Sequence, residues 1–152
     1  MRIFLAGVIQ GSKKGRGVVA QDYRRPMKAA LAQAFPGAEV FDPVEHHPKS
    51  VHYPDRKGRA VFRHLMREAA RYDALVAFLP EASMGTAIEI WEARCAGRFV
   101  AAVTPMDRNW VIRYLCDRVY PDLAAFSRAC RDGTLRAAVL RRARKRSAPK
   151  CR

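Results

Sequence analysis

The chain lacks the features that mark membrane and secreted proteins. No run of about 18 apolar residues occurs in its 152 residues, so a membrane-spanning helix is not expected. The segment from Met1 to Gly7 is too short, and too soon interrupted by glycine, to be a signal peptide. The four cysteines show no CxxC spacing, which favours reduced thiols. We therefore expect a cytoplasmic protein with no membrane partner.

Motifs for common cofactors and metals are also missing. The glycine-containing segment from Gly7 to Gly17 has neither GxGxxG nor GxxxxGK[ST] in order, which argues against dinucleotide and P-loop sites. His46, His47 and His52 are close in sequence, but no HExxH or cysteine-pair spacing accompanies them. We expect no metal and no cofactor, and we interpret these histidines as part of a solvated or base-contacting loop.

Acidic residues are few, with 14 Asp and Glu against 29 Lys and Arg and a formal net charge of +15. The last 17 residues contain no acid and eight basic residues, namely Arg136, Arg141, Arg142, Arg144, Lys145, Arg146, Lys150 and Arg152. Such a tail attracts nucleic acid or anionic surfaces without specificity, although a solvated, frayed helix end is the plainer interpretation. We expect a domain over residues 1–135 and a basic tail over 136–152 outside the core.

Apolar runs and helical patterns alternate along the rest of the chain. Strands are expected at 2–6, 38–41, 74–79 and 99–103, with a brief fifth strand near Val119. Helices are expected at 21–35, 59–71, from Gly85 or Thr86 onward, 109–118 and 121–130, and the pattern over 136–146 could continue the last one. This alternation predicts one α/β domain, in which helices cover both faces of a parallel sheet of four to five strands.

In such a sheet a ligand is expected at the carboxyl ends of the strands, where the loops after Ala6, Phe41, Leu79 and Val103 would gather. The loop expected at 42–57 contains three prolines that oppose regular structure, and loops of this length in compact domains are usually functional.

The segment from Ala74 to Glu89 is the strongest candidate for chemistry. An apolar strand leads through a short turn into a helix that carries Glu89 in its first turn, and helix N-termini favour anions because their N–H groups are unpaired. A carboxylate there could face a phosphorylated sugar. The alternative is structural, since Thr86 and Glu89 have the spacing of a capping box. Ser83 could cap the helix or donate to a ligand.

Two segments carry a resemblance to a known family. They are Phe4-Leu5-Ala6-Gly7-Val8-Ile9-Gln10-Gly11-Ser12 and Ser83-Met84-Gly85-Thr86-Ala87-Ile88-Glu89, and the second of them follows the strand just described. The chain resembles the nucleoside 2-deoxyribosyltransferase-like superfamily, which includes the deoxynucleoside 5′-monophosphate N-glycosidases, over roughly residues 2 to 120. The resemblance implies a flavodoxin-like, Rossmann-like sheet and a homodimer or higher homo-oligomer. It also implies a glutamate, here Glu89, that attacks the anomeric carbon. Gly85, Thr86 and Glu89 are similar to the GGxGTxxE signature of cytokinin-type nucleotide phosphoribohydrolases as well, which break the same bond class.

The expected substrate contacts are Gly7, Gln10, Gly11, Ser12, Asp42, Ser83, Gly85, Thr86, Asn109 and Trp110. Trp110 could stack on a base or begin a helix that faces the core.

The sequence also departs from the family: Val8 and Gln10 stand where the related hydrolases have serine and arginine. Leu65 stands where many members have an aspartate, so His64, Glu68, Asp22 or Asp42 remain as alternative acids.

These features predict an enzyme that cleaves or transfers the N-glycosidic bond of nucleosides or nucleoside 5′-monophosphates. A close carboxylate can trap the oxocarbenium-like carbon, and water or another base then completes the reaction. Lys13, Lys14 and Arg16 favour a modest, salt-sensitive preference for monophosphates. The rival interpretation is a non-catalytic nucleotide-sensing or RNA-binding module that uses the basic tail.

Overall fold

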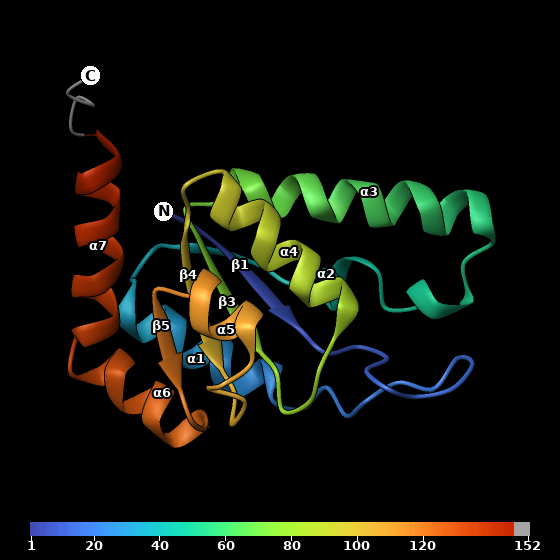
Figure 1. The fold of residues 1–152 in the computed structure, drawn as a ribbon, viewed down its shortest axis with the longest axis horizontal. Coiled ribbons are helices and arrows are strands. Elements are labelled where there is room, and N and C mark those ends of the chain that lie inside the picture. The colour runs from blue at the N-terminus through green and yellow to red at the C-terminus, as the bar shows by residue number, and fades with distance from the viewer. Residues whose placement is uncertain (148–152) are drawn as a thin grey trace.

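Five parallel strands form the centre of the molecule, and the computed structural model describes residues 1–147 (Figure 1). The strands, in the spatial order β2-β1-β3-β4-β5, are β1 (Arg2–Gly7), β2 (Glu39–Phe41), β3 (Ala74–Phe78), β4 (Phe99–Val103) and β5 (Arg118–Tyr120). This order is the flavodoxin-like one, and the switch point lies between β1 and β3. The expected α/β fold with a parallel sheet is therefore confirmed, with five strands.

Helices cover both faces of the sheet, which is why its central strands are apolar along their whole length. The helices are α1 (Arg24–Ala34), α2 (Pro43–His46), a 3-10 turn at Ser50–His52, α3 (Asp55–Arg71), α4 (Met84–Cys95), α5 (Trp110–Leu115), α6 (Leu123–Arg131) and α7 (Thr134–Ser147). All five residues of β4 are buried, as expected for a strand packed on two sides.

Successive residues of each strand point to opposite faces and build two separate cores. Ile3 and Leu5 pack with α1, α6 and α7 on one face. Phe4 packs with α3, α4 and α5 on the other face, and Phe41 at the end of β2 stacks on its ring at 5.4 Å between centroids. The second face carries the candidate site.

The segment after β2 is more regular than the sequence suggested. Asp42 caps α2 by accepting a hydrogen bond from Val44 N, and Pro43 occupies the first helical turn, where its missing N–H costs nothing. Helix α3 then begins at Asp55, four residues before the expected start. The expectation of an irregular loop over residues 42–57 is therefore wrong, although no element before α3 in this segment exceeds one turn.

Helix α7 changes the expected boundary between domain and tail. Leu135, Ala138 and Val139 are buried against the first core, so the chain does not leave the core at residue 135 as expected. Arg142 also reaches Asp117 at 3.9 Å, which ties the middle of α7 to the start of β5. Lys150 and Arg152 of the expected tail lie outside the described residues. Within residues 1–147, no helix is both long and apolar enough to cross a membrane.

Candidate active site

A cavity of about 550 Å³ opens where the carboxyl ends of β1 and β3 meet the start of α4. Its size suits a small-molecule ligand, and it lies at the switch point of the sheet, where ligands bind in this class of fold. Three segments line it: the loop after β1, the segment from the 3-10 turn into α3, and the first two turns of α4.

The start of α4 is fixed by Ser83. Its Oγ accepts hydrogen bonds from Thr86 N at 3.4 Å and Thr86 Oγ1 at 3.1 Å, so Ser83 is the N-cap and the helix begins at Met84. The N–H groups at the start of a helix have no partner within the helix and can bind a ligand. The capping box considered for Thr86 and Glu89 is not formed, because Thr86 lies inside the helix rather than at its cap.

Glu89 is among the residues that line this cavity. Only 8% of the residue is exposed, and its side chain makes no hydrogen bond or ion pair with another residue of 1–147. Burial raises the pKa of Glu89 to about 8, and the positive charge of Arg24 opposes that rise. Of the described residues that line the cavity, Glu89 is also the one acid. A buried carboxyl with a displaced pKa and no structural partner is typical of a catalytic group.

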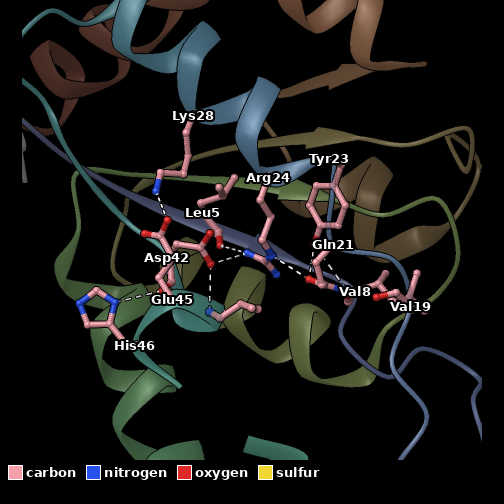
Figure 2. Close-up of polar contacts among 11 residues, drawn as sticks. Leu5, Val8, Val19, Gln21, Tyr23, Arg24, Lys28, Asp42, Glu45 and His46 are labelled. Carbon is pink, nitrogen blue, oxygen red and sulfur yellow. Dashed lines mark hydrogen bonds and ion pairs between the residues drawn. The ribbon is translucent and has the colours of Figure 1, made fainter. Parts of the chain in front are cut away.

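Arg24 does not line the cavity and is held in place by a network of hydrogen bonds (Figure 2). Its guanidinium donates to Asp42 Oδ1 at 2.8 Å, to the Leu5 carbonyl at 3.2 Å and to Gln21 Oε1 at 2.7 Å. Asp42 is 1% exposed and is not among the residues lining the cavity. The structure therefore places Asp42 as the partner of Arg24 and the cap of α2, and not beside a ligand.

Tyr23 lies beneath the first loop and explains why residue 7 is glycine. A Cβ at Gly7 would lie 2.3 Å from the Tyr23 hydroxyl, a distance that no side chain tolerates. The ring of Tyr23 packs on Phe78 at 4.3 Å between centroids, and burial raises its pKa to about 12. The backbone of Gly7 can thus border the cavity directly.

No family model and no curated protein matches the sequence. Solved structures do match in fold. BlsM is 20% identical with a TM-score of 0.66, over 99% of this chain and 96% of that one. A 2-deoxyribosyltransferase from the psychrotolerant bacterium Bacillus psychrosaccharolyticus is 19% identical with a TM-score of 0.60, over 84% and 90%. A conserved protein from Enterococcus faecalis V583 is 18% identical with a TM-score of 0.58, over 86% and 97%.

This chain has the same fold as BlsM and a 2-deoxyribosyltransferase. The resemblance inferred from two short motifs is thereby confirmed at the level of the fold.

This fold brings most of the expected site residues together at the cavity. Its lining includes Gly7, Gln10, Gly11, Ser83, Gly85 and Thr86, together with Glu89. Gln10 also donates to the Gly15 carbonyl at 3.0 Å, which closes the first loop on itself.

Three other expected contacts are not among the residues that line the cavity. Asn109 caps α5 and lines a separate cavity of about 160 Å³ beyond Ser83. Trp110 is 76% exposed and contacts the ring of Tyr114 edge-on. Ser12 uses its N–H to bind Glu81 Oε1 at 3.3 Å. Neither the core-facing nor the cavity-facing position considered for Trp110 is observed.

The side of the cavity formed by α3 and the 3-10 turn was not predicted from the sequence. Val61, Phe62, Leu65 and Met66 line it from α3, and Ser50, Val51 and Tyr53 line it from the segment before. The apolar stripe of α3 was visible in the sequence, but its spacing is the same for a helix facing a core and one facing a cavity.

The acids considered as substitutes for the missing aspartate do not reach the cavity. Asp22 and His64 are exposed, and the half-buried Glu68 pairs with Arg71 at 3.0 Å. Across residues 1–147, no three or more His, Cys, Asp or Glu side chains are grouped so as to hold a metal ion.

Proposed function

We propose that the protein cleaves or transfers the N-glycosidic bond of a nucleoside or nucleoside 5′-monophosphate, with Glu89 as the nucleophile. The observation that carries this proposal is the placement of Glu89: a buried carboxyl, without a partner in the described chain, in a cavity of ligand size at the switch point. The fold likeness supports the class of chemistry, because one similar structure is a 2-deoxyribosyltransferase.

The proposed reaction passes through one covalent ester between Glu89 and the anomeric carbon of the sugar, which forms in the first step and is broken in the second. The ionised carboxylate of Glu89 attacks the anomeric carbon as the bond to the base breaks, and the bonding electrons leave with the base nitrogen. The departing base must gain a proton or a hydrogen bond. Water, or a second base in the transfer reaction, then attacks the anomeric carbon and releases Glu89.

Tyr53 is our candidate for contact with the departing base. It lines the cavity, its hydroxyl lies 3.4 Å from His47 Nδ1, and the Lys57 ammonium lies 3.9 Å from its ring centroid. Ser50, Ser83 and Thr86 carry the other side-chain hydroxyls of the described lining, and those of Ser83 and Thr86 bond to each other at the start of α4.

The test is release of free base, followed by chromatography across a panel of nucleosides and their 5′-monophosphates. Glu89→Gln keeps the size of the side chain but removes the nucleophile, and we expect activity to fall by about a thousandfold or more. Glu92→Gln, one turn further along α4 and outside the cavity lining, is the matched control. Near-normal activity in folded Glu89→Gln protein would contradict the mechanism.

A second candidate is a non-catalytic nucleotide-sensing or RNA-binding module. It is favoured by Arg136, Arg141 and Arg144, which are exposed on α7. If this candidate holds, no variant or wild-type protein releases base, and RNA binding falls when residues 141–152 are removed. An enzyme would keep its base release after the same deletion.

We also infer a homodimer or a higher homo-oligomer. Met84, Ile88 and Trp91 are exposed along α4, and Phe62 is exposed on the neighbouring α3. Met84, Ile88 and Phe62 also line the cavity, so this exposed apolar surface is continuous with the site. Exposed apolar surface of this kind usually marks an interaction site, and a second copy of the chain would cover it.

A further inference from the structure

The first loop of the cavity already contacts an anion that belongs to the protein. Glu81 Oε1 accepts a hydrogen bond from Ser12 N at 3.3 Å. The same oxygen would lie 1.8 Å from a Cβ at Gly11, where φ is 55°. Gly11 lines the cavity, so the Glu81 carboxylate is packed against the loop that forms the polar part of the site.

The position of Glu81 affects which ligand can bind, because loops of this kind usually bind phosphate. Glycine-containing turns and helix N-termini at this edge of a sheet present N–H groups that suit phosphate. Here Glu81 is half-buried in the turn between β3 and α4, two residues before the helix cap. Glu81 does not itself line the cavity, but its carboxylate puts a negative charge against Gly11, which does.

The basic residues of the loop do not overcome this charge. Of the described residues lining the cavity, Lys13 is the one that is basic. Its charge is matched by that of Glu81, and a lysine offers a point charge without the bidentate geometry of an arginine. Lys14 and Arg16 are exposed and do not line the cavity, so solvent screens them.

We propose that Glu81 sets the substrate class of this site by excluding a 5′-phosphate and selecting nucleosides with a free 5′-hydroxyl. The chemistry differs for the two groups. A neutral 5′-hydroxyl is not repelled by the Glu81 carboxylate, whereas a phosphate dianion held at Gly11 would lie close to that carboxylate and is repelled. This inference rests on the proposed function, and it reverses the preference for monophosphates expected from the basic residues of the loop.

The kinetic test compares kcat/KM for a nucleoside and its own 5′-monophosphate in wild type, Glu81→Gln and Glu92→Gln. We expect wild type to favour the nucleoside by about tenfold or more, and Glu81→Gln to move that ratio toward the monophosphate by about tenfold or more. Glu92→Gln removes the same charge from α4 and should leave the ratio unchanged. A wild type that favours the monophosphate, or a ratio that Glu81→Gln does not move, overturns the proposal.

A binding test separates this proposal from the proposed function. Calorimetry with ribose and ribose 5-phosphate, which lack a base, measures the sugar end of the site without any catalysis. We expect Glu81→Gln, but not Glu92→Gln, to gain affinity for ribose 5-phosphate relative to ribose. If that gain appears while no protein releases base, the proposed function fails and the role of Glu81 stands. If base is released but the relative affinity is unchanged, the role of Glu81 fails and the function stands.

Discussion

Glu89 is held in a place that favours its neutral form, yet the proposed reaction needs its ionised form. Burial raises its pKa to about 8, and the nearby charge of Arg24 is the opposing influence. Arg24 cannot move to a different partner easily, because Asp42, Leu5 and Gln21 all hold its guanidinium. The pKa of Glu89 is therefore raised mainly by burial, and the buried Arg24 that opposes this rise does not itself line the cavity.

The first prediction concerns the dependence of activity on pH. We expect kcat/KM to rise with pH and to level off above about 8, because only the ionised fraction of Glu89 in the free enzyme can react. The measurement is a profile of base release across neutral and mildly alkaline pH with a substrate that does not titrate in this range. A flat profile through neutral pH would show that the pKa of Glu89 is not raised.

The second prediction concerns stability at the same residue. Between the ordinary carboxyl pKa of 4.5 and about 8, the folded protein keeps a proton on Glu89 that the unfolded chain loses. The stabilising contribution is thus complete below the lower value and is lost as pH rises through the higher one. We expect Glu89→Gln to raise the free energy of unfolding relative to wild type by roughly 1–3 kcal/mol above pH 8, and by less at acidic pH.

Urea denaturation of both proteins on either side of this pH range gives the comparison, with Glu92→Gln as the control for loss of a charge from the same helix. An equal difference between Glu89→Gln and wild type at both pH values would contradict the linkage.

Among the elements, the strands were the most predictable from sequence. The runs before Gly7, before Pro80 and before Thr104 are apolar and short, which fits strands buried on both faces. The N-cap of α4 was less predictable, because Ser83 and Thr86 are both residue types that commonly cap helices. Only the packing of the chain decides which of the two is the N-cap. The cavity side of α3 could not be predicted at all, since an apolar stripe does not reveal what it faces.

Helix α7 gives the third prediction. A protein that ends at Leu140 keeps the buried Leu135, Ala138 and Val139, and we expect its thermal midpoint to stay within a few degrees of wild type. A protein that ends at Asp132 loses all three and exposes the core beneath them, which should cost several kcal/mol and lead to unfolding or aggregation. Thermal melts of the two truncated proteins provide the comparison, and equal stability would show that α7 is not part of the core.

At the scale of the whole molecule, the exposed apolar surface was the feature least predictable from the sequence. The net charge of +15 was visible at once, but the sequence could not show that Met84, Ile88 and Trp91 share an exposed face of α4. Each is apolar and each has helical spacing, so the same pattern would serve a buried helix. Only the packing of α4 on the sheet through Ile90 and Ala93 reveals which side is left uncovered.

The fourth prediction tests assembly. We expect light scattering to show a homodimer or higher oligomer, and Trp91→Arg to shift it toward monomer, because a charge in the centre of an apolar interface is costly. Val18→Arg adds the same group at a similarly exposed apolar position that belongs to the loop before α1, and should leave the assembly intact. A monomeric wild type at micromolar concentration would remove the proposed interface.

The cap at Ser83 also determines which changes in chain length the site can survive. Glu89 reaches the cavity because it lies six positions after the cap, and each residue inserted between them would rotate it by about 100° around the helix axis. Residues 80–82 lie before the cap, so insertions or deletions there would change the turn that leads into α4 without changing the spacing from Ser83 to Glu89. Libraries that vary the length of this short turn are therefore a direct route to altered substrate scope, whereas spacing from Ser83 to Glu89 has to stay fixed.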